Sequence, residues 1–190
     1  MNTATVSCET RVLKNNVKLY WQYNCDKIWF TFQTIKGRKI TLDEVPVEFY
    51  GYTYRLGYHF VKEFDKSILF RSGCPANGPC IYTLIDKTTG RKIEEFRQLI
   101  CINGDIEENK KYQFEFIVYA DSNYKNLIVN YPDKKQVLKI PFDFQRNNLT
   151  AVIPEYQFDK IKLERSLLTL FYTTTSNKKL NLKIDLKSKK

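Results

Sequence analysis

The sequence predicts an all-β, antiparallel domain, most simply a sandwich or a distorted barrel. Three observations predict this fold class. Aromatic residues make up 15% of the chain, with 13 Tyr and 13 Phe, and aromatic side chains are enriched in strands. Apolar and polar residues alternate along much of the chain, as in strands that bury one face. Turn signals separate the alternating segments at short intervals, which favours hairpins.

The alternation is clearest near the C-terminus, where Leu180, Leu182, Ile184 and Leu186 share one face of an expected strand. The same pattern predicts strands at residues 17–23, 28–32, 112–119 and 127–131. The turn signals between strands are Lys14-Asn15-Asn16, Lys36-Gly37, Thr89-Gly90, Asn103-Gly104, Pro132-Asp133-Lys134 and Ser176-Asn177. One segment, 154–171, fits either a short helix that begins at Pro154 or two strands broken near Arg165.

A short hairpin pattern recurs along the chain. A turn followed by basic and apolar residues occurs at 37–40, 90–93, 135–140 and 178–184. The spacing of about 40 to 55 residues is the period of propeller blades, so a small hairpin-repeat or propeller-like array is the alternative fold. The segments share little beyond the hairpin itself, and ordinary hairpins of a sandwich are the simpler interpretation.

Charge and length set the expected organisation. We expect residues 1–182 to form a single domain and residues 183–190 to form a lysine-rich tail. The net charge of +10 favours acidic partners. The lysines are spread over turns and strands, however, so a solvated basic surface is the simpler interpretation. Basic, aromatic-rich barrels bind nucleic acid, but the cysteines and the absence of an aromatic-basic RNA-binding signature argue against a nucleic-acid partner.

The five cysteines fit disulfides better than metal ligands, because the chain has one histidine and no short pair of zinc-ligating spacing. Cys74 and Cys80 enclose five residues that include two prolines and an Asn-Gly turn, so we expect a disulfide between them. Cys8 and Cys25 lie almost symmetrically about the first predicted turn, and we expect a second bridge there. Cys101 has apolar neighbours and is expected to be a buried thiol.

Disulfides favour an extracytoplasmic location, periplasmic or secreted. Export would require that a signal peptide has been removed and that Met1 is not native, because the N-terminus has no apolar run of signal-peptide length. The alternative is a cytoplasmic protein with reduced cysteines, which an odd number of cysteines fits. No segment has 18 consecutive apolar residues, so no membrane span is expected.

The candidate binding site lies at residues 49–60, where tyrosines are concentrated. In an extended strand the first three of these tyrosines project from one face. Such a row stacks on sugars or anchors a protein partner, whereas a cross-strand aromatic ladder is the purely structural interpretation. The candidate binding residues are Tyr50, Tyr52, Tyr54, Arg55, Tyr58 and His59.

No nucleotide-binding, metalloprotease or serine-hydrolase motif is present, so we expect no catalytic residue, cofactor or metal site. The preferred function is a noncatalytic binding module that engages another protein, such as an inhibitor, an immunity-type protein or a surface recognition domain. The first alternative is a glycan-binding or cell-wall-associated domain. The second is an atypical hydrolase that pairs His59 with a carboxylate; the candidate carboxylates are Glu94, Glu95, Asp105, Glu107 and Glu108.

Three observations separate these functions. A concave tyrosine platform favours a glycan, a flat or convex patch with adjacent charge favours a protein partner, and a deep cleft with His59 beside a carboxylate favours an enzyme.

Overall fold

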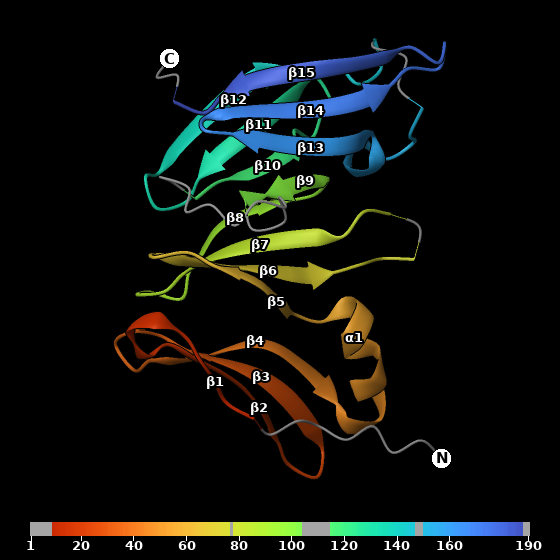
Figure 1. The fold of residues 1–190 in the computed structure, drawn as a ribbon. Coiled ribbons are helices and arrows are strands. Elements are labelled where there is room, and N and C mark those ends of the chain that lie inside the picture. Colours follow the sequence, from red (N-terminus) through yellow and green to blue (C-terminus); the bar gives the residue numbers. More distant parts are fainter. Residues whose placement is uncertain (1–8, 77, 104–114, 147–149, 188–190) are drawn as a thin grey trace. The chain divides into compact units, whose positions relative to one another are not determined.

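The computed structural model describes residues 9–76, 78–103, 115–146 and 150–187 and confirms the all-β, antiparallel prediction. The described residues form four antiparallel sheets, none of them a closed barrel. Each sheet consists of strands that follow one another in the sequence, so every sheet is a meander (Figure 1). No crossover connection is needed within any of them.

The strands have the following bounds. The first sheet contains β1 (Arg11–Val12), β2 (Lys18–Tyr23), β3 (Lys27–Gln33) and β4 (Lys39–Pro46). The second contains β5 (His59–Glu63), β6 (Ser67–Gly73), β7 (Ile81–Asp86) and β8 (Lys92–Phe96). The third contains β9 (Leu99–Ile102), β10 (Ile117–Ala120), β11 (Asn126–Tyr131) and β12 (Gln136–Pro141). The fourth contains β13 (Phe158–Glu164), β14 (Leu167–Thr173) and β15 (Lys179–Asp185).

Short helical segments lie between strands. The 3-10 helix η2 (Val47–Tyr52) and the helix α1 (Thr53–Leu56) follow each other directly and connect the first sheet to the second. Single 3-10 turns occur at Lys14–Asn16 and Pro154–Tyr156. No helix in the described ranges is both long and apolar enough to cross a membrane.

The chain divides into two compact units, Met1–Glu95 and Phe96–Lys190, and each has its own core. In the first unit, side chains of the first and second sheets share one hydrophobic cluster, and the rings of Phe30 and Phe70 lie 6.3 Å apart. In the second unit, the third and fourth sheets share another, in which Phe142 contacts Phe158 and Tyr172. Sheets packed through one apolar layer are typical of a sandwich. The single domain expected for residues 1–182 stays a prediction.

The four repeated sequence segments lie in the last hairpin of each sheet. Each of these hairpins contains one residue with a positive φ: Gly37 (78°), Gly90 (69°), Lys135 (51°) and Asn177 (59°). The first and last are built alike, because the N–H of Thr34 donates to Arg38 O, and that of Thr174 donates to Lys178 O, at 2.9 and 3.0 Å. In both hairpins the threonine hydroxyl also accepts a hydrogen bond from the backbone N–H four residues later, which belongs to Arg38 or Lys178. The repeated segments are therefore ordinary hairpins, one in each sheet, and the propeller-like array stays a prediction.

A buried ion pair, which the sequence did not point to, connects the first two sheets. Lys87 is fully buried, and its Nζ lies 2.5 Å from Oε1 of Glu63. The same oxygen accepts the N–H of Lys14 at 2.8 Å, and the carbonyl of Lys87 accepts the N–H of Ile35 at 3.0 Å. Lys14 and Ile35 belong to turns of the first sheet, so Lys87 and Glu63 hold these turns against the second.

Two sequence predictions are resolved at the C-terminal end. Residues 154–171 form a 3-10 turn and two strands, because Arg165 has a φ of 59° and reverses the chain between β13 and β14. The helix considered there is wrong, and the two-strand alternative is confirmed. The expected tail begins inside β15, which continues to Asp185 and is followed by the buried Leu186. The start of the strand expected at 112–119 lies outside the described residues.

Candidate binding surface

The segment that the sequence predicted as a tyrosine-bearing strand is helical, so that prediction is wrong. Proline lacks a backbone N–H and has a fixed φ, and Pro46 is the last residue of β4. In the helix that follows, the hydroxyl of Thr53 donates to the carbonyl of Tyr50 at 2.7 Å, a local bond that an extended strand does not permit. The Tyr50 ring packs edge-on against Trp21, with centroids 5.6 Å apart. Tyr50, Tyr52 and Tyr54 therefore do not share a strand face.

The helical segment exposes a concentrated apolar surface, which we name the aromatic face. Its members and their exposed fractions are Val47 (42%), Phe49 (51%), Tyr52 (62%), Tyr54 (69%) and Leu56 (56%). Thirteen large hydrophobic side chains are exposed in the described part of the chain, and five of them lie within these ten residues. Single exposed apolar residues are ordinary, whereas a contiguous group of them marks an interaction site. Of these five, Phe49 and Tyr52 are shown to lie together, with ring centroids 6.1 Å apart.

A cavity of about 390 Å³ opens beside the aromatic face. It is lined by Asp43, Val45, Pro46, Phe49, Tyr52, Thr53, Leu56 and Gly57. Its walls are mostly apolar, and among the described residues that line it Asp43 is the only charged one. We name it the Asp43 cavity.

The carboxyl group of Asp43 has an uncommon environment. Burial raises its pKa above the ordinary value of 3.8, and hydrogen bonds from the backbone N–H groups of Tyr58 and Glu44, together with the nearby His59, partly oppose this shift. Its Oδ2 atom is buried and accepts no hydrogen bond from any residue that the structure describes. A Cβ at Gly57 would lie 2.6 Å from this oxygen, so a glycine is needed to leave space for the carboxyl group.

His59 holds the end of α1. Its Nε2 lies 2.7 Å from the carbonyl oxygen of Thr53, and because a carbonyl only accepts, Nε2 carries the proton. The N–H of Gly57 donates to the same carbonyl at 2.9 Å. The last carbonyls of a helix have no partners within it. The carbonyl of Thr53, the first residue of α1, therefore accepts two hydrogen bonds, one from the helix end and one from the only histidine of the chain.

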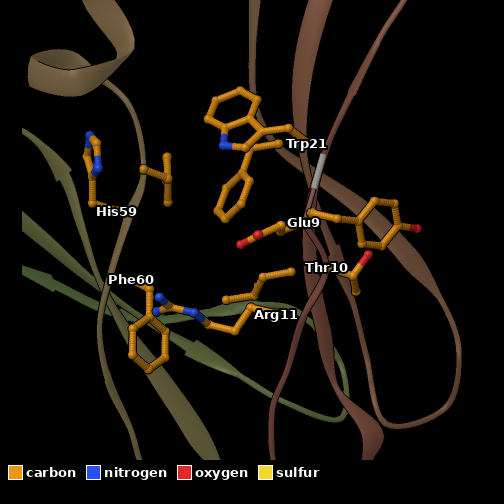
Figure 2. A pocket seen from close by; sticks show the side chains of 10 residues that line it. Glu9, Thr10, Arg11, Trp21, His59 and Phe60 are labelled. Atoms are coloured by element: carbon orange, nitrogen blue, oxygen red, sulfur yellow. The ribbon is translucent and has the colours of Figure 1, made fainter. Parts of the chain in front are cut away.

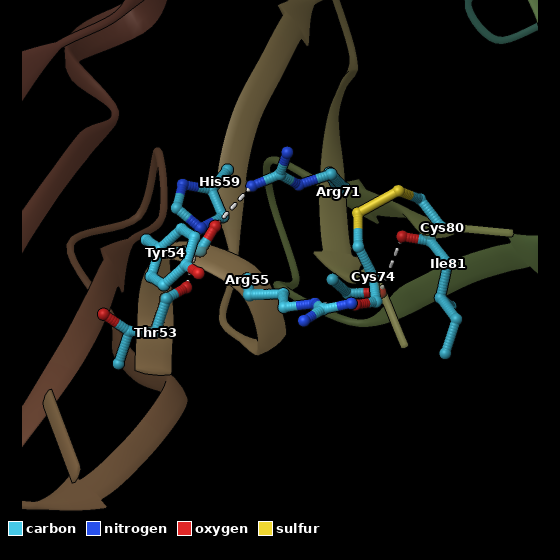
Figure 3. Close-up of a disulfide and its surroundings, with 9 residues drawn as sticks. Thr53, Tyr54, Arg55, His59, Arg71, Cys74, Cys80 and Ile81 are labelled. Atoms are coloured by element: carbon cyan, nitrogen blue, oxygen red, sulfur yellow. Dashed lines mark hydrogen bonds between the residues drawn. A yellow bond between two sulfur atoms is a disulfide. The ribbon is translucent and has the colours of Figure 1, made fainter. Parts of the chain in front are cut away.

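Further donors to the helix come from β6 and from the disulfide-bonded Cys74 (Figure 3). Cys74 and Cys80 are bonded, which confirms the predicted bridge. The N–H of Cys74 donates to Arg55 O at 2.8 Å, and Nε of Arg55 donates to Cys74 O at 3.2 Å. Nη2 of Arg71 donates to Tyr54 O at 2.8 Å. The helix that carries the aromatic face is therefore anchored on β6 and on the disulfide.

A second cavity, of about 460 Å³, lies between the N-terminal strands and β5 (Figure 2). It is lined by Glu9, Thr10, Arg11, Leu19, Tyr20, Trp21, Phe30, Tyr58, His59 and Phe60. The guanidinium of Arg11 lies 4.5 Å from the centre of the Phe60 ring. Glu9 and His59 project from different segments of the wall (Figure 2). Nε2 of His59 donates to Thr53 O, so this nitrogen is not placed to act as a base in the cavity.

The six predicted site residues take different roles. Tyr52 and Tyr54 lie on the aromatic face, and Tyr50 packs against Trp21. Arg55 anchors the helix, and Tyr58 and His59 line the second cavity. Sequence reasoning missed Val47, Phe49, Leu56 and Asp43. The signal was present in Pro46 and in the spacing of three between Phe49 and Tyr52, which places their rings 6.1 Å apart on a 3-10 helix.

The other candidates are placed as follows. Cys101 is buried in the core of the second unit, and Cys25 is exposed. Cys8 lies outside the described residues, so its bridge to Cys25 stays a prediction. Glu94 and Glu95 lie on β8, where Glu95 pairs with Lys92 at 2.8 Å. Asp105, Glu107 and Glu108 lie outside the described residues. Within the described ranges, no group of three or more His, Cys, Asp or Glu side chains is arranged to hold a metal ion.

Fold and surface together define a class: an all-β protein of consecutive antiparallel meanders that carries an exposed aromatic face on a short helical segment. No protein-family model matches the sequence, and no curated protein matches it.

Proposed function

We propose that this protein is a noncatalytic binding module that engages another protein through the aromatic face. One observation carries the proposal: five large apolar side chains are exposed on ten consecutive residues. Tyrosine and phenylalanine are enriched in protein interfaces, where they supply large contact area. Large exposed aromatic side chains of this kind anchor protein partners, and in this protein they lie on a short helical segment.

The anchoring of the helix supports this proposal. Hydrogen bonds from His59, Arg71 and Cys74 fix the end of α1 before any partner arrives. A surface that is already ordered loses less conformational entropy when it binds. A helix of four residues would not persist in isolation, so we infer that these contacts maintain a surface used in recognition.

The disulfide supports an oxidising, extracytoplasmic compartment, periplasmic or secreted, as the place of action. Within that setting we propose an inhibitor, an immunity-type protein or a surface recognition domain. All three act by occupying a partner's surface, and none requires a catalytic group.

The test is a set of alanine variants measured against the partner. The oxidised protein is immobilised, its partner is captured from the native source and identified, and the affinity of the purified pair is measured by calorimetry. Tyr52→Ala and Tyr54→Ala should each weaken binding by about 1 to 3 kcal/mol, as interface anchors do. Their melting temperatures should change by only a few degrees, because both side chains are exposed in the free protein.

Tyr23→Ala is the matched control, since Tyr23 is 61% exposed on β2, outside the aromatic face. It should leave the affinity unchanged. If Tyr23→Ala weakens binding as much as Tyr52→Ala, or if neither Tyr52→Ala nor Tyr54→Ala weakens it, the aromatic face is not the contact surface.

A second candidate function, glycan binding, is favoured by the second cavity. Trp21, Tyr58 and Phe60 line it together with Arg11 and Glu9, a combination of aromatic faces and polar groups that suits a sugar. Titration of the intrinsic tryptophan fluorescence with cell-wall oligosaccharides tests it, and Trp21→Phe separates the signal of Trp21 from that of Trp29. A saturable change that Trp21→Phe removes would support a glycan site.

A further inference from the structure

The second cavity is lined by an arginine whose N–H groups have no acceptor in the described chain. Arg11 of β1 is exposed, and its guanidinium lies 4.5 Å from the centre of the Phe60 ring. The ring attracts the positive charge but offers no lone pair to the five N–H donors. Within the described residues, the guanidinium forms no hydrogen bond and no ion pair. Its donors are therefore open to a ligand in the cavity.

The position of the guanidinium is fixed before a ligand arrives. Arg11 belongs to β1 and Phe60 to β5, and each of these strands lies at the edge of a described sheet. The N–H of Lys14 donates to Oε1 of Glu63 at 2.8 Å, so a second contact holds the two edges together. A side chain that is already held in place loses less conformational entropy when it binds.

The charges of the lining limit the kind of ligand. Glu9 and Arg11 both lie on the wall of the cavity (Figure 2). His59 lines it too, but its Nε2 donates to Thr53 O, and its charge interaction is with Asp43, which lies outside the lining. A ligand with many anionic groups would be repelled by Glu9, whereas a neutral ligand would leave Arg11 without a counter-charge. The lining therefore favours a ligand with one anionic group.

The other groups of the lining favour a sugar. Trp21 and Tyr58 contribute aromatic rings, against which the C–H face of a sugar ring can pack. A carboxylate accepts several hydrogen bonds, so Glu9 can accept from a ligand hydroxyl in addition to its contacts within the chain. The volume of about 460 Å³ lies within the range of cavities that hold small ligands. A carboxylate at the end of a peptide would suit Arg11 equally well, but it brings no set of hydroxyl groups for Glu9.

We propose that the second cavity binds an acidic sugar of the uronic-acid class. Its carboxylate pairs with the guanidinium of Arg11, its ring lies against the aromatic side chains, and its hydroxyl groups face Glu9. The inference rests on the glycan-binding candidate and names the substrate class of that site. A carboxylate fits because its two oxygens match the planar fork of an arginine, which gives a paired, charge-assisted contact.

Titration calorimetry with the whole oxidised protein tests the inference. The ligands are the trimer of galacturonic acid, the methyl ester of this trimer, and the trimer of galactose. The ester keeps the rings and the ring hydroxyl groups but removes the charge. Wild-type protein should bind the acid roughly tenfold more tightly than the ester, the effect of one charge-assisted contact at an exposed site. This comparison uses the wild type alone, so it does not depend on whether any variant folds.

Two variants assign the preference to the cavity. Arg11→Gln should remove the preference for the acid and leave the affinity for the ester unchanged. Arg38→Gln is the matched control, because Arg38 is exposed between β3 and β4 and does not line the cavity. It should keep the preference. If Arg38→Gln reduces the preference as much as Arg11→Gln does, the preference reflects the overall charge of the protein, and the inference is wrong.

The remaining outcomes separate this inference from the glycan function on which it rests. Equal binding of the acid and the ester supports a glycan site and overturns the uronic-acid inference. Binding of none of the three sugars overturns both. A fourth ligand, the peptide acetyl-Gly-Ala-Gly with a free C-terminal carboxylate, tests the other source of the same group. If it binds as tightly as the acid trimer and loses this affinity in Arg11→Gln, the site recognises protein carboxylates and the sugar assignment is wrong.

Discussion

Removing the disulfide should loosen the helix that carries the aromatic face. The change is the double variant Cys74→Ser and Cys80→Ser. The bridge spans the end of the β6–β7 hairpin, next to the pair Gly73 and Ile81. The backbone of Cys74 also makes two hydrogen bonds to Arg55: its N–H donates to Arg55 O, and its carbonyl accepts from Nε of Arg55. Without the bridge, the end of the hairpin frays and both bonds to the helix weaken.

The magnitude follows from the length of the closed loop. The bridged residues are six positions apart, and in the chain-entropy model a loop of this size contributes about 2 kcal/mol to the free energy of unfolding. For a chain of this length, each kcal/mol corresponds to roughly 2 to 4 °C in the melting temperature. We therefore expect a decrease of about 4 to 8 °C.

Calorimetry measures the stability, and hydrogen exchange followed by mass spectrometry locates the loosening. Amide exchange of α1, in particular of the Gly57 N–H that donates to Thr53 O, should accelerate in the variant. Wild-type protein reduced by a phosphine should behave in the same way. If exchange accelerates only in residues 73–81 and α1 stays protected, the disulfide does not hold the helix, and the reasoning is wrong.

Two further predictions concern buried charges in the first unit. Lys87→Ala leaves Glu63 without its buried cation and should reduce the free energy of unfolding by about 3 to 5 kcal/mol in a denaturant titration. Lys92→Ala, which removes an exposed pair with Glu95, is the control and should leave the titration midpoint nearly unchanged. Because burial raises the pKa of Asp43 above the unfolded value of 3.8, the stability due to its protonation is present below that pH and is lost as the pH rises through the folded value. The melting temperature of Asp43→Asn relative to that of the wild type should therefore rise as the pH is raised from below 3.8. A difference that does not change with pH would contradict this assignment.

Much of the fold could be predicted because antiparallel strands leave a local signal. The alternation at Leu180 to Leu186 and the turns at Gly37, Gly90 and Asn177 depend only on neighbours in the sequence. The disulfide was predictable for the same reason, since the loop between Cys74 and Cys80 is short. The two-strand alternative within 154–171 was also visible, although the pattern of that segment fitted a helix equally well.

The candidate site could not be predicted in the same way, because tertiary contacts decide its structure. The tyrosines of residues 50–54 alternate like those of a strand, and what makes the segment helical is Pro46 together with donors from Arg71 and Cys74, more than 15 residues away in sequence. Asp43 and Lys87 gave no signal, since a charged residue in the sequence does not reveal whether its side chain is buried. Only the structure places Asp43 in an apolar cavity and Lys87 beside Glu63.

The meander organisation has a consequence for synthesis of the chain. Because each sheet contains only strands that follow one another, all of its backbone pairings are available once its last strand has left the ribosome. No strand of these four described sheets has to wait with an open edge for a partner encoded much later in the sequence, which limits the time in which edges are open to aggregation. Synthesis from the N-terminus would therefore complete the sheets one after another, and the first two, which share a core, would be able to pack before translation of the second unit ends.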